Sequence, residues 1–557
     1  MIEDFRSASC PTALAADVCI IGAGPAGISL ATALAGTPWT VMLLEGGGQR
    51  GEASSQALYE GESVGPYALD PAQCRLRALG GATRVWGGGC IPMSSAEMAR
   101  RDWVPDSGWP IGWNELAPWY ERAGQVCRIE PGAFDDGNFH IDPAHADSTP
   151  PLPHIHSRIS RSSTIDFGHA YRDLLRKDRG VRLLLHANLL RLEATEDAGA
   201  VRSALIGSID GRRGQVRARY FVLAAGGLEN ARLLLLSDDV ASSGLGNDRD
   251  LVGRYFMDHP RCHIGTVRCS DAAHRARRHT RPRDPCPSPF YPHISLTDSA
   301  QRSHRLLHAR AREFAVERDA PKGVASLRAL RASLRGPRAP DEGARVEARL
   351  LDALEQDLPM TTAPVGTGST GRLALRTMLN AGDVAGAALR KLAHRGAVET
   401  DRLEIVGYFE QAPNRDSRVS LSDRRDALGL RRIRVDWRMG ELDKASIRSG
   451  SGLIGSDVAA RFGGRLEPAA WLQEPTAPPP LHGTAHHLGT TRMSDSPASG
   501  VVDPQCRVHG IDNLYVAGSS VFPTGGWSFP TFTIVALALR IADQLRTRLA
   551  DMSMLGL

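Results

Sequence analysis

Three glycines near the N-terminus have the spacing of a phosphate-binding turn. Gly22-x-Gly24-x-x-Gly27 follows the apolar run "DVCIIGAG" and opens "GPAGISLATALAG", which has the spacing of a helix. Gly22 permits a tight turn, Gly24 lets the backbone approach a pyrophosphate, and Gly27 lets the helix pack on the strand. The N–H groups at the start of a helix favour a phosphate. The spacing therefore predicts a dinucleotide site, which also includes Pro25 and Ala26.

An acidic residue follows at the end of the next apolar strand, "WTVMLLEGG". A carboxylate at that place, Glu45, would accept hydrogen bonds from the ribose hydroxyls of the nucleotide. Strand, turn, helix and strand over residues 17–48 thus predict one βαβ unit. The motif alone does not distinguish FAD from NAD.

Composition limits the class of protein. A chain of 557 residues is expected to form two or three domains. The net charge of +5 is small for this length. The sequence has no basic stripe with interleaved aromatic residues, so nucleic-acid binding is not expected. The 9 cysteines are scattered, which argues against a disulfide framework and against a metal site. The N-terminus does not resemble a secretory signal, and the apolar runs are shorter than the roughly 20 residues of a membrane span. We therefore expect a cytoplasmic enzyme acting on a small molecule, without membrane or nucleic-acid partners and of open oligomeric state.

The rest of the chain shows further elements. Residues 78–93, "ALGGATRVWGGGCIPM", are dense in glycine and predict a loop. Strand-like runs at "VRLLLHANLLRL" and "YFVLAAGG" precede a helix from "LENARLLLL". Two segments, "GVASLRALRASLRG" and "ARVEARLLDALEQDL", have helical periodicity with charged faces, so we interpret them as solvated helices. Residues 403–440 alternate as strands, and the chain ends with a strand, "NLYVAG", and a helix from about residue 530.

Four segments together resemble the glucose–methanol–choline (GMC) oxidoreductase family. They are "DVCIIGAGPAGISLATALAG", "LGGATRVWGGGCIPM", "GRYFMDHP" and "AHHLGTTRMSDSPASGVVDPQCRVHGIDNLYVAGSSVFPTGG". The resemblance covers the N-terminal third and the last ~80 residues well, whereas residues 270–400 match loosely. Within the family the chain is most similar to bacterial relatives of pyranose and glycoside oxidases.

The resemblance implies FAD as the cofactor and an α/β fold. It implies a discontinuous, Rossmann-like FAD-binding domain and an α+β substrate domain whose sheet covers the flavin. We predict that residues 1–265 form the FAD-binding domain with inserted cap loops, and that residues 266–479 mainly form the substrate domain. Residues 480–557 then return to the FAD-binding domain and carry the catalytic histidine.

The matched motifs also imply residues along the cofactor. Leu190 is expected to offer its backbone to the adenine, and several small or flat residues are expected along the flavin, the pyrophosphate and the ribityl chain: Thr83, Trp86, Gly87, Gly88, Ala225, Gly226, Ala517 and Gly518. Bulky side chains would not fit at several of these positions, which is a physical reason for so many glycines and alanines. Some pyranose oxidases carry a histidine, bonded to the flavin, where this chain has Val85. Since valine cannot form that bond, we predict non-covalent FAD.

His486 matches the catalytic histidine of the family. It heads "HHLGTTRM", three residues before the motif glycine Gly489. Oxidation of an alcohol on a flavin needs a base for the hydroxyl proton while hydride leaves carbon for flavin N5, and the pKa of histidine suits a base. The neighbouring His487 is the second candidate, and adjacent residues on an extended segment point to opposite sides. Other histidines, such as His259 and His509, lie in contexts that look structural.

The stretch "GWSFPT" places Phe529 where the family usually has a second polar side chain, His or Asn. Phenylalanine cannot accept a proton. It is also a poor N-cap for the helix that follows, where Asn would be favoured by about 1 kcal/mol. Pro530 suits the first helical turn, and the resemblance implies that the N–H of Thr531 points at the flavin C2 carbonyl. The positive end of that helix would stabilise the anionic reduced flavin.

Three hypotheses account for Phe529. In the first, the enzyme oxidises a hydroxyl with His486 alone as base and Phe529 as an apolar wall. In the second, the chemistry has shifted to dehydrogenation at a less polar carbon or at an amine. In the third, the flavin is structural and the protein is a redox-inactive lyase or binding protein. The resemblance favours sugars, glycosides or other secondary metabolites as substrates, and it leaves the electron acceptor open.

Overall fold

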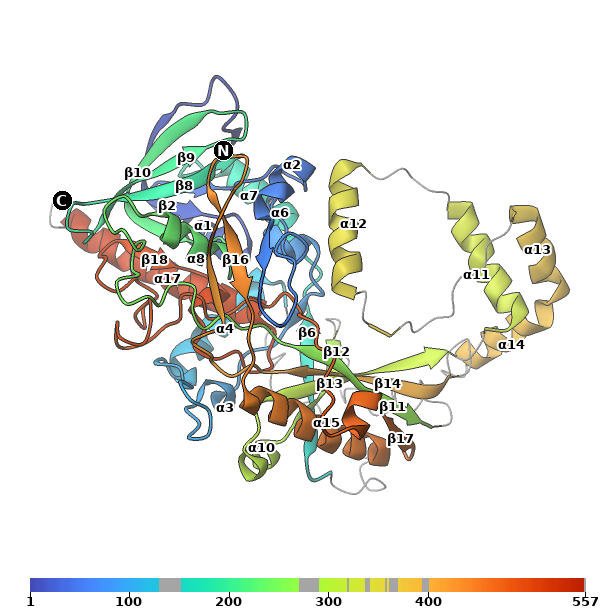
Figure 1. Cartoon of the computed structure of the whole chain (residues 1–557). Helices are drawn as coiled ribbons and strands as arrows, with labels where there is room; N and C mark the ends of the chain where they lie inside the picture. The colour runs from blue at the N-terminus through green and yellow to red at the C-terminus, as the bar shows by residue number, and fades with distance from the viewer. Residues whose placement is uncertain are drawn as a thin grey trace.

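The computed structural model describes residues 1–129, 152–269, 290–317, 320–335, 341–355, 358–359, 369–392 and 400–554. Within these residues the chain forms a large sheet around the nucleotide motif, a second large sheet, and a small sheet between distant segments (Figure 1). Helices cover the two large sheets, and the site lies between them.

The first sheet has the nucleotide motif at its centre. β2 (Ala13–Ile21) runs parallel to both of its neighbours, β3 (Val41–Leu44) and β10 (Arg213–Leu223), and α1 (Pro25–Leu34) connects β2 to β3. Val18 to Ile21 are buried, as expected for a parallel strand that is covered on both faces. The strand order is β1 (Ile2–Asp4), β7 (Val181–Leu185), β3, β2, β10, β9 (Val201–Gly207) and β8 (Asn188–Ala194), with β18 (Leu514–Val516) also paired to β10.

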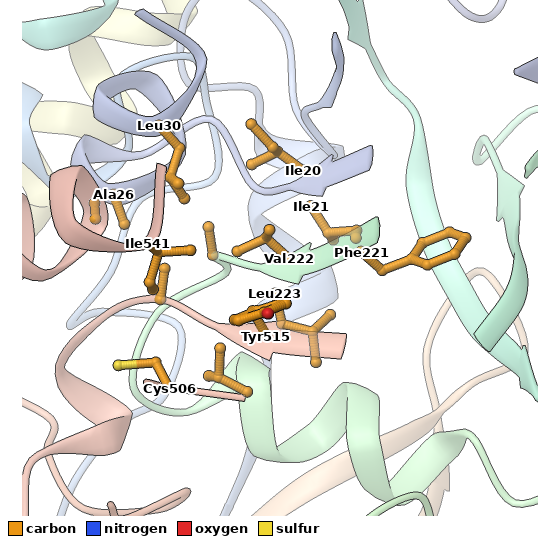
Figure 2. Packing of buried hydrophobic residues seen from close by; sticks show 14 of the residues in the cluster. Ile20, Ile21, Ala26, Leu30, Phe221, Val222, Leu223, Cys506, Tyr515 and Ile541 are labelled. Carbon is orange, nitrogen blue, oxygen red and sulfur yellow. The ribbon is translucent and has the colours of Figure 1, made fainter. Parts of the chain in front are cut away.

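Segments from both ends of the chain share the core of this sheet. The long helix α17 (Pro530–Met554) packs against α1 and against α4 (Trp113–Val126). Figure 2 shows the side chains that meet there, which come from β2, β10, β18, α1 and α17: Ile20, Ile21, Val222, Leu223, Tyr515, Ala26, Leu30 and Ile541. The C-terminal elements β18 and α17 are therefore part of the nucleotide-binding core.

One face of the second sheet is covered by a helix, and the opposite face lines the candidate site. Its order is β17 (Arg465–Pro468), β11 (Arg261–Arg268), β14 (Thr400–Phe409), β13 (Ala309–Glu317), β12 (Phe290–Leu296), β6 (Ile155–Ser162) and β5 (Gly89–Cys90). α15 (Glu441–Arg461) covers one face, where Ile447 and Ile454 join a buried cluster with Ala311 and Ile405. Because side chains alternate along a strand, the neighbours of these residues point to the opposite face.

A third sheet joins β15 (Arg418–Arg425) and β16 (Arg431–Asp436) to β4 (Gly61–Ser63). Figure 1 shows α11 (Lys322–Arg335), α13 (Thr370–Leu379) and α14 (Ala381–Leu392) projecting away from both large sheets, with α12 (Glu342–Glu355) closer to the first one. The remaining helices and 3-10 turns of the described residues are α2 (Ala53–Gln56), α3 (Ser95–Met98), α6 (Phe167–Ala170), α7 (Arg172–Lys177), α8 (Glu229–Leu236), α10 (Asp298–His304), α16 (Ala470–Gln473), η1 (Ala57–Tyr59), η2 (Gly81–Arg84) and η4 (Ser519–Val521).

The predicted fold class, α/β with a Rossmann-like domain and a second, α+β part, is confirmed. The division into 1–265, 266–479 and 480–557 stays a prediction, and β5 and β6, which lie within 1–265, pair in the second sheet. The run "VRLLLHANLLRL" forms two strands, because His186 turns the backbone with a positive φ of 57°. No helix in the described ranges has the length and the apolar character needed to cross a bilayer.

Candidate active site

A cavity of about 640 Å³ lies between the two large sheets and contains most of the predicted site residues. One end is formed by the carboxyl ends of β2, β3 and β10 and by the start of α1. The other end is formed by the exposed face of the second sheet, by the segment around His486 and by the start of α17. Ligands of open α/β sheets bind at such strand ends.

Gly22 and Gly27 allow the turn at the nucleotide end to close tightly. Gly22 has a φ of +106°, and a Cβ atom there would lie 2.6 Å from the carbonyl oxygen of Ala224. A Cβ atom on Gly27 would lie 1.9 Å from the carbonyl oxygen of Gly22. Side chains at either position would thus separate helix from strand.

Other residues of the cradle leave room for a ligand. A Cβ atom on Gly24, Gly87 or Gly226 would meet no atom within 4 Å. Gly24 precedes α1 and no side chain caps this helix, so the first N–H groups of α1 are available to an anion. The carboxylate of Glu45 lines the cavity and accepts hydrogen bonds from the backbone N–H groups of Ala23 (3.1 Å) and Gly47 (2.8 Å).

This cradle fits FAD on the evidence of its own geometry. The open glycines and the uncapped helix suit a pyrophosphate, and the buried Glu45 suits a ribose. At the other end, α17 begins at Pro530, and Pro530, Thr531 and Ile534 line the cavity. His487 also lines it, and its Nε2 atom is buried without a hydrogen-bond partner among the described residues, so it is available to a bound group.

His486 and His487 line different parts of the cavity wall. The ring of His487 is close to Phe256, with ring centroids 5.9 Å apart, and burial lowers its pKa to about 3. The ring of His486 faces His259 and Phe529. Burial lowers the pKa of His486 well below its usual value, and the neighbouring His259 and Arg310 lower it further. Both imidazoles are therefore uncharged at neutral pH.

The contacts of His259 determine which nitrogen of His486 carries the proton. Nε2 of His259 lies 3.4 Å from the carbonyl oxygen of Gly525, to which only an N–H can donate. Nδ1 of the uncharged His259 is then an acceptor, and it lies 3.0 Å from Nδ1 of His486. His486 consequently donates through Nδ1, and its Nε2 keeps a lone pair. Burial lowers the pKa of His259 to about 4, which agrees with this assignment.

A buried carboxylate holds the backbone of this segment. Asp258 is fully buried and accepts hydrogen bonds from the backbone N–H groups of His486 (2.9 Å), Ala485 (3.2 Å) and His259 (2.7 Å). The hydroxyl of Thr484 also donates to Asp258 at 3.0 Å. Asp258 therefore fixes His259 and His486 through their backbones, and Ala485, which directly precedes His486, takes a positive φ of 60°.

Phe529 lies between the histidine and an arginine of the second sheet. Its ring is in edge contact with His486 (5.9 Å between centroids) and with His293 (5.5 Å). The guanidinium carbon of Arg310 lies over the same ring at 4.5 Å and over the ring of Tyr408 at 3.8 Å. A polar side chain at position 529 would replace one of the two aromatic contacts of a buried cation.

Two buried acids hold the turn that leads into α17. Glu97 accepts hydrogen bonds from the backbone N–H groups of Trp527 and Ser528, both at 2.9 Å. Glu410 accepts from the N–H of Gly526 at 3.2 Å and forms a two-pronged ion pair with Arg101 at 2.6 and 2.7 Å. These bonds position Phe529 and the first turn of α17.

Most predicted site residues line the cavity: Gly22, Gly24, Pro25, Ala26, Glu45, Trp86, Gly87, Gly88, Ala225, Gly226, Ala517, Gly518, His486, His487, Phe529 and Thr531. Three others do not. Gly27 lies within α1 on the face that packs against Gly22 and Ile20, and the hydroxyl of Thr83 donates to the carbonyl of Gly80 at 2.6 Å. Leu190 packs in a small cluster with Leu58 and Leu428, and Leu189 lines the cavity instead because the register shifts at this point of β8.

Sequence reasoning missed several residues of the site. His259 contacts the candidate base directly, although its motif looked structural. Arg310 and Arg312 line the cavity from alternate positions of β13, and the alternation in "RAREF" was the available signal. Residues 344–355 of the segment expected to be a solvated helix lie in α12, which contributes Leu351 and Leu354 to the cavity wall.

Comparisons with known proteins agree with this geometry. Residues 413–538 match the family model described as GMC oxidoreductase. The chain is 24% identical to 6'''-hydroxyparomomycin C oxidase of Streptomyces lividus, over 96% of this chain and 92% of that protein. It is 25% identical to paromamine 6'-oxidase of Streptomyces fradiae, over 83% of this chain and 77% of that protein.

Solved structures show the same fold. A formate oxidase variant of Aspergillus oryzae RIB40, solved in a study of FAD modification, is 18% identical and superimposes with a TM-score of 0.57. That alignment covers 98% of this chain and 100% of the other.

Proposed function

Because this chain belongs to the GMC oxidoreductase family and is an FAD-dependent oxidoreductase, we propose that it oxidises a hydroxyl group of a sugar, a glycoside or another secondary metabolite to a carbonyl, with His486 as the base. One observation carries this proposal. The imidazole of His486, with its free lone pair on Nε2, lines the same cavity as the glycine cradle that fits FAD.

Each residue has a stated part in this reaction. His486 accepts the hydroxyl proton on Nε2, and His259 holds the ring in the tautomer that leaves this atom free. FAD, when bound, supplies the acceptor for the hydride that leaves the carbon. The first N–H groups of α17, including that of Thr531, stabilise negative charge near them. Phe529 forms an apolar wall beside the substrate carbon.

We propose that FAD is held without a covalent bond through the glycine-rich loop. Val85 lines the cavity and packs against Leu76 and Val346, and a valine side chain offers no nucleophile. Denaturation should therefore release FAD from the polypeptide, and flavin that stays with the precipitated protein would contradict this part of the proposal.

The test is anaerobic reduction of the purified yellow protein. Sugars, glycosides and simple alcohols are added in turn, and bleaching of the flavin absorbance is followed. His486→Ala should slow reduction by about 100- to 10,000-fold, the usual contribution of a general base. His509→Ala is the matched control, because His509 contacts the backbone of Ser494 and does not line the cavity.

Three outcomes separate the hypotheses raised by Phe529. Reduction at full speed in His486→Ala would contradict the role of the base. Bleaching by an amine or a C–H donor, with no alcohol active, would contradict hydroxyl oxidation. No bleaching by any compound, while dithionite still reduces the flavin, would contradict a redox function. Admission of air after bleaching identifies whether oxygen is an electron acceptor.

A further inference from the structure

Arg310 is a buried cation on the wall of the cavity. Only 3% of its surface is exposed, yet it lines the cavity from the second residue of β13, the central strand of the second sheet. Burial lowers the pKa of its guanidinium to about 10, which leaves it charged at neutral pH. Burying a charge is costly unless an opposite charge or several hydrogen bonds compensate for it.

Within the described residues, no carboxylate pairs with Arg310. Its one hydrogen-bond partner there is Nδ1 of His293, at 3.4 Å from Nη1, and its Nε atom has none. His293 is uncharged, because burial lowers its pKa well below the usual value, and its other nitrogen contacts the hydroxyl of Ser160 at 2.8 Å. Most of the N–H groups of Arg310 are therefore left for a ligand.

Neighbouring residues strengthen the positive charge of this wall. Tyr408 on β14 pairs with Arg310 on β13 and with Arg261 on β11, so the three side chains form one row on the same face. Arg312 follows on that face, two residues after Arg310. All four residues line the cavity. An anion bound at this row would meet the fields of three arginines.

The acids of the cavity wall are engaged elsewhere or lie at its rim. Among the described residues they are Glu45, Glu229 and Glu355. Glu45 accepts backbone hydrogen bonds at the nucleotide end, and Glu229 pairs with Arg75 and Arg232. Glu355 lies exposed at the last turn of α12. The cavity around Arg310 therefore favours a negatively charged ligand.

Aromatic contacts hold Arg310 without using its N–H groups. Its guanidinium carbon lies 3.8 Å from the ring centre of Tyr408 and 4.5 Å from that of Phe529. Such contacts stabilise the cation while the planar N–H fork stays free for a carboxylate, which it matches in geometry. This gives Phe529 a second role, since the ring that touches the base also supports the cation.

We propose that Arg310, in the field of the neighbouring Arg261 and Arg312, binds the carboxylate of a hydroxy-acid substrate whose reacting hydroxyl lies at His486. The ring of Phe529 separates the two groups, so the carboxylate stands about one sugar ring from the oxidised carbon. A uronic acid or its glycoside has this arrangement. The proposal rests on the proposed function for the position of the hydroxyl, but the anion site itself does not depend on catalysis.

The test uses equilibrium binding to the oxidised holoenzyme, followed through the flavin spectrum and by calorimetry. The probes are methyl glucuronide, its methyl ester, and methyl glucoside, together with benzoate as an anion without hydroxyls. Wild-type protein should bind methyl glucuronide ~10- to 100-fold more tightly than the ester, the usual value of a charge-assisted hydrogen bond. Arg310→Met should remove that difference and leave the dissociation constant of methyl glucoside unchanged.

Two further variants test whether a loss of binding in Arg310→Met comes from misfolding. Arg310→Lys keeps the charge without the planar fork, so it should retain part of the preference for the acid. Arg268→Met removes an arginine of β11 that pairs with Glu467 on the surface, and it should bind all four probes like wild type. Flavin content and thermal melting are measured for each variant.

The outcomes distinguish this inference from the proposed function. Equal binding of acid and ester by wild type, or an undiminished preference in Arg310→Met, would overturn the carboxylate site. Tighter binding of inorganic phosphate than of benzoate would overturn the choice of a carboxylate. If methyl glucoside still reduced the flavin while any of these results was obtained, the carboxylate site would be wrong and hydroxyl oxidation would still hold. Arg310-dependent binding of benzoate without reduction by any hydroxyl compound would support the anion site and contradict hydroxyl oxidation.

Discussion

The imidazole of His486 keeps its lone pair because its surroundings oppose a second proton. The titratable and charged groups that face it are His259, His487, Arg310 and Arg261, and burial is the main cause of its lowered pKa. A base with a lowered pKa is active above that value and is lost only as the pH falls through it. The rate of flavin reduction should therefore stay constant down to pH 6.5 and decline only below it.

The measurement is stopped-flow reduction across the pH range, with wild type and His259→Ala compared. His259→Ala removes a group that lowers the pKa of His486, so the acid limb of the profile should move to higher pH. His509→Ala should leave the profile unchanged. An acid limb at or above pH 6.5 in wild type would show that the pKa of the base is not lowered.

Replacing the ring of Phe529 should weaken the binding of an acidic ligand. Phe529→Leu keeps an apolar wall but loses the ring over Arg310, and such contacts contribute about 0.5–2 kcal/mol. Methyl glucuronide should then bind roughly 2- to 30-fold more weakly, since a factor of ten corresponds to about 1.4 kcal/mol.

Phe529→Asn introduces a polar group beside His486 and a helix cap worth about 1 kcal/mol for α17. The rate of reduction by methyl glucoside should rise ~10-fold relative to Phe529→Leu, because a second group then positions the hydroxyl. Equal rates in the two variants would show that the missing polar group does not limit the reaction.

For single residues, sequence motifs identify those that carry the chemistry of a known motif themselves. They do not identify residues whose role depends on a neighbouring side chain. His486 and Phe529 are found from motifs, and both line the cavity. The roles of His259 and Arg310 depend on which strands lie side by side, and no local pattern encodes that pairing.

Among the elements, α17 depends on a carboxylate more than four hundred residues away in the chain. Glu97 accepts hydrogen bonds from the backbone N–H groups of Trp527 and Ser528, and from the hydroxyl of Ser528 at 3.0 Å. Glu97→Ala should lower the free energy of unfolding by roughly 3–5 kcal/mol, because it leaves these buried donors without their acceptor and removes the ion pair with Arg158.

Chemical unfolding of the holoenzyme measures this change. Glu196→Ala is the control, because Glu196 is exposed on the surface. Equal unfolding midpoints for the two variants would contradict a structural role for Glu97. If the turn alone is affected, Glu97→Ala should also release flavin faster than Glu196→Ala.

The elements themselves follow from sequence where periodicity is strong. The βαβ unit over residues 17–48 appears as β2, α1 and β3, and the helix from about residue 530 appears as α17. The two-residue strand β5 lies in a loop dense in glycine, and its pairing with β6 is decided by the second sheet. Short strands of this kind are set by tertiary contacts, which a single sequence does not display.

For the whole molecule, the cavity joins the two large sheets, so FAD should stabilise both together. Ligand at a hundredfold excess over its dissociation constant adds about 2.7 kcal/mol to stability. Apoprotein should melt at lower temperature than holoprotein and be cleaved faster by protease. ADP, which can occupy only the nucleotide end, should restore less stability than FAD. Equal melting of apoprotein and holoprotein would contradict a cofactor site shared by both sheets.

The pairing of β18 with β10, and of α17 with α1, has a consequence for how the protein forms. The first sheet and α1 cannot complete their packing until β18 and α17 have been synthesised, since these are the final strand and the final helix of the described chain. Closing such long loops is slow, and incomplete sheets expose apolar edges that aggregate. A ribosome-bound chain should therefore acquire its flavin only after β18 and α17 have emerged, and until then its exposed apolar edges should bind chaperones.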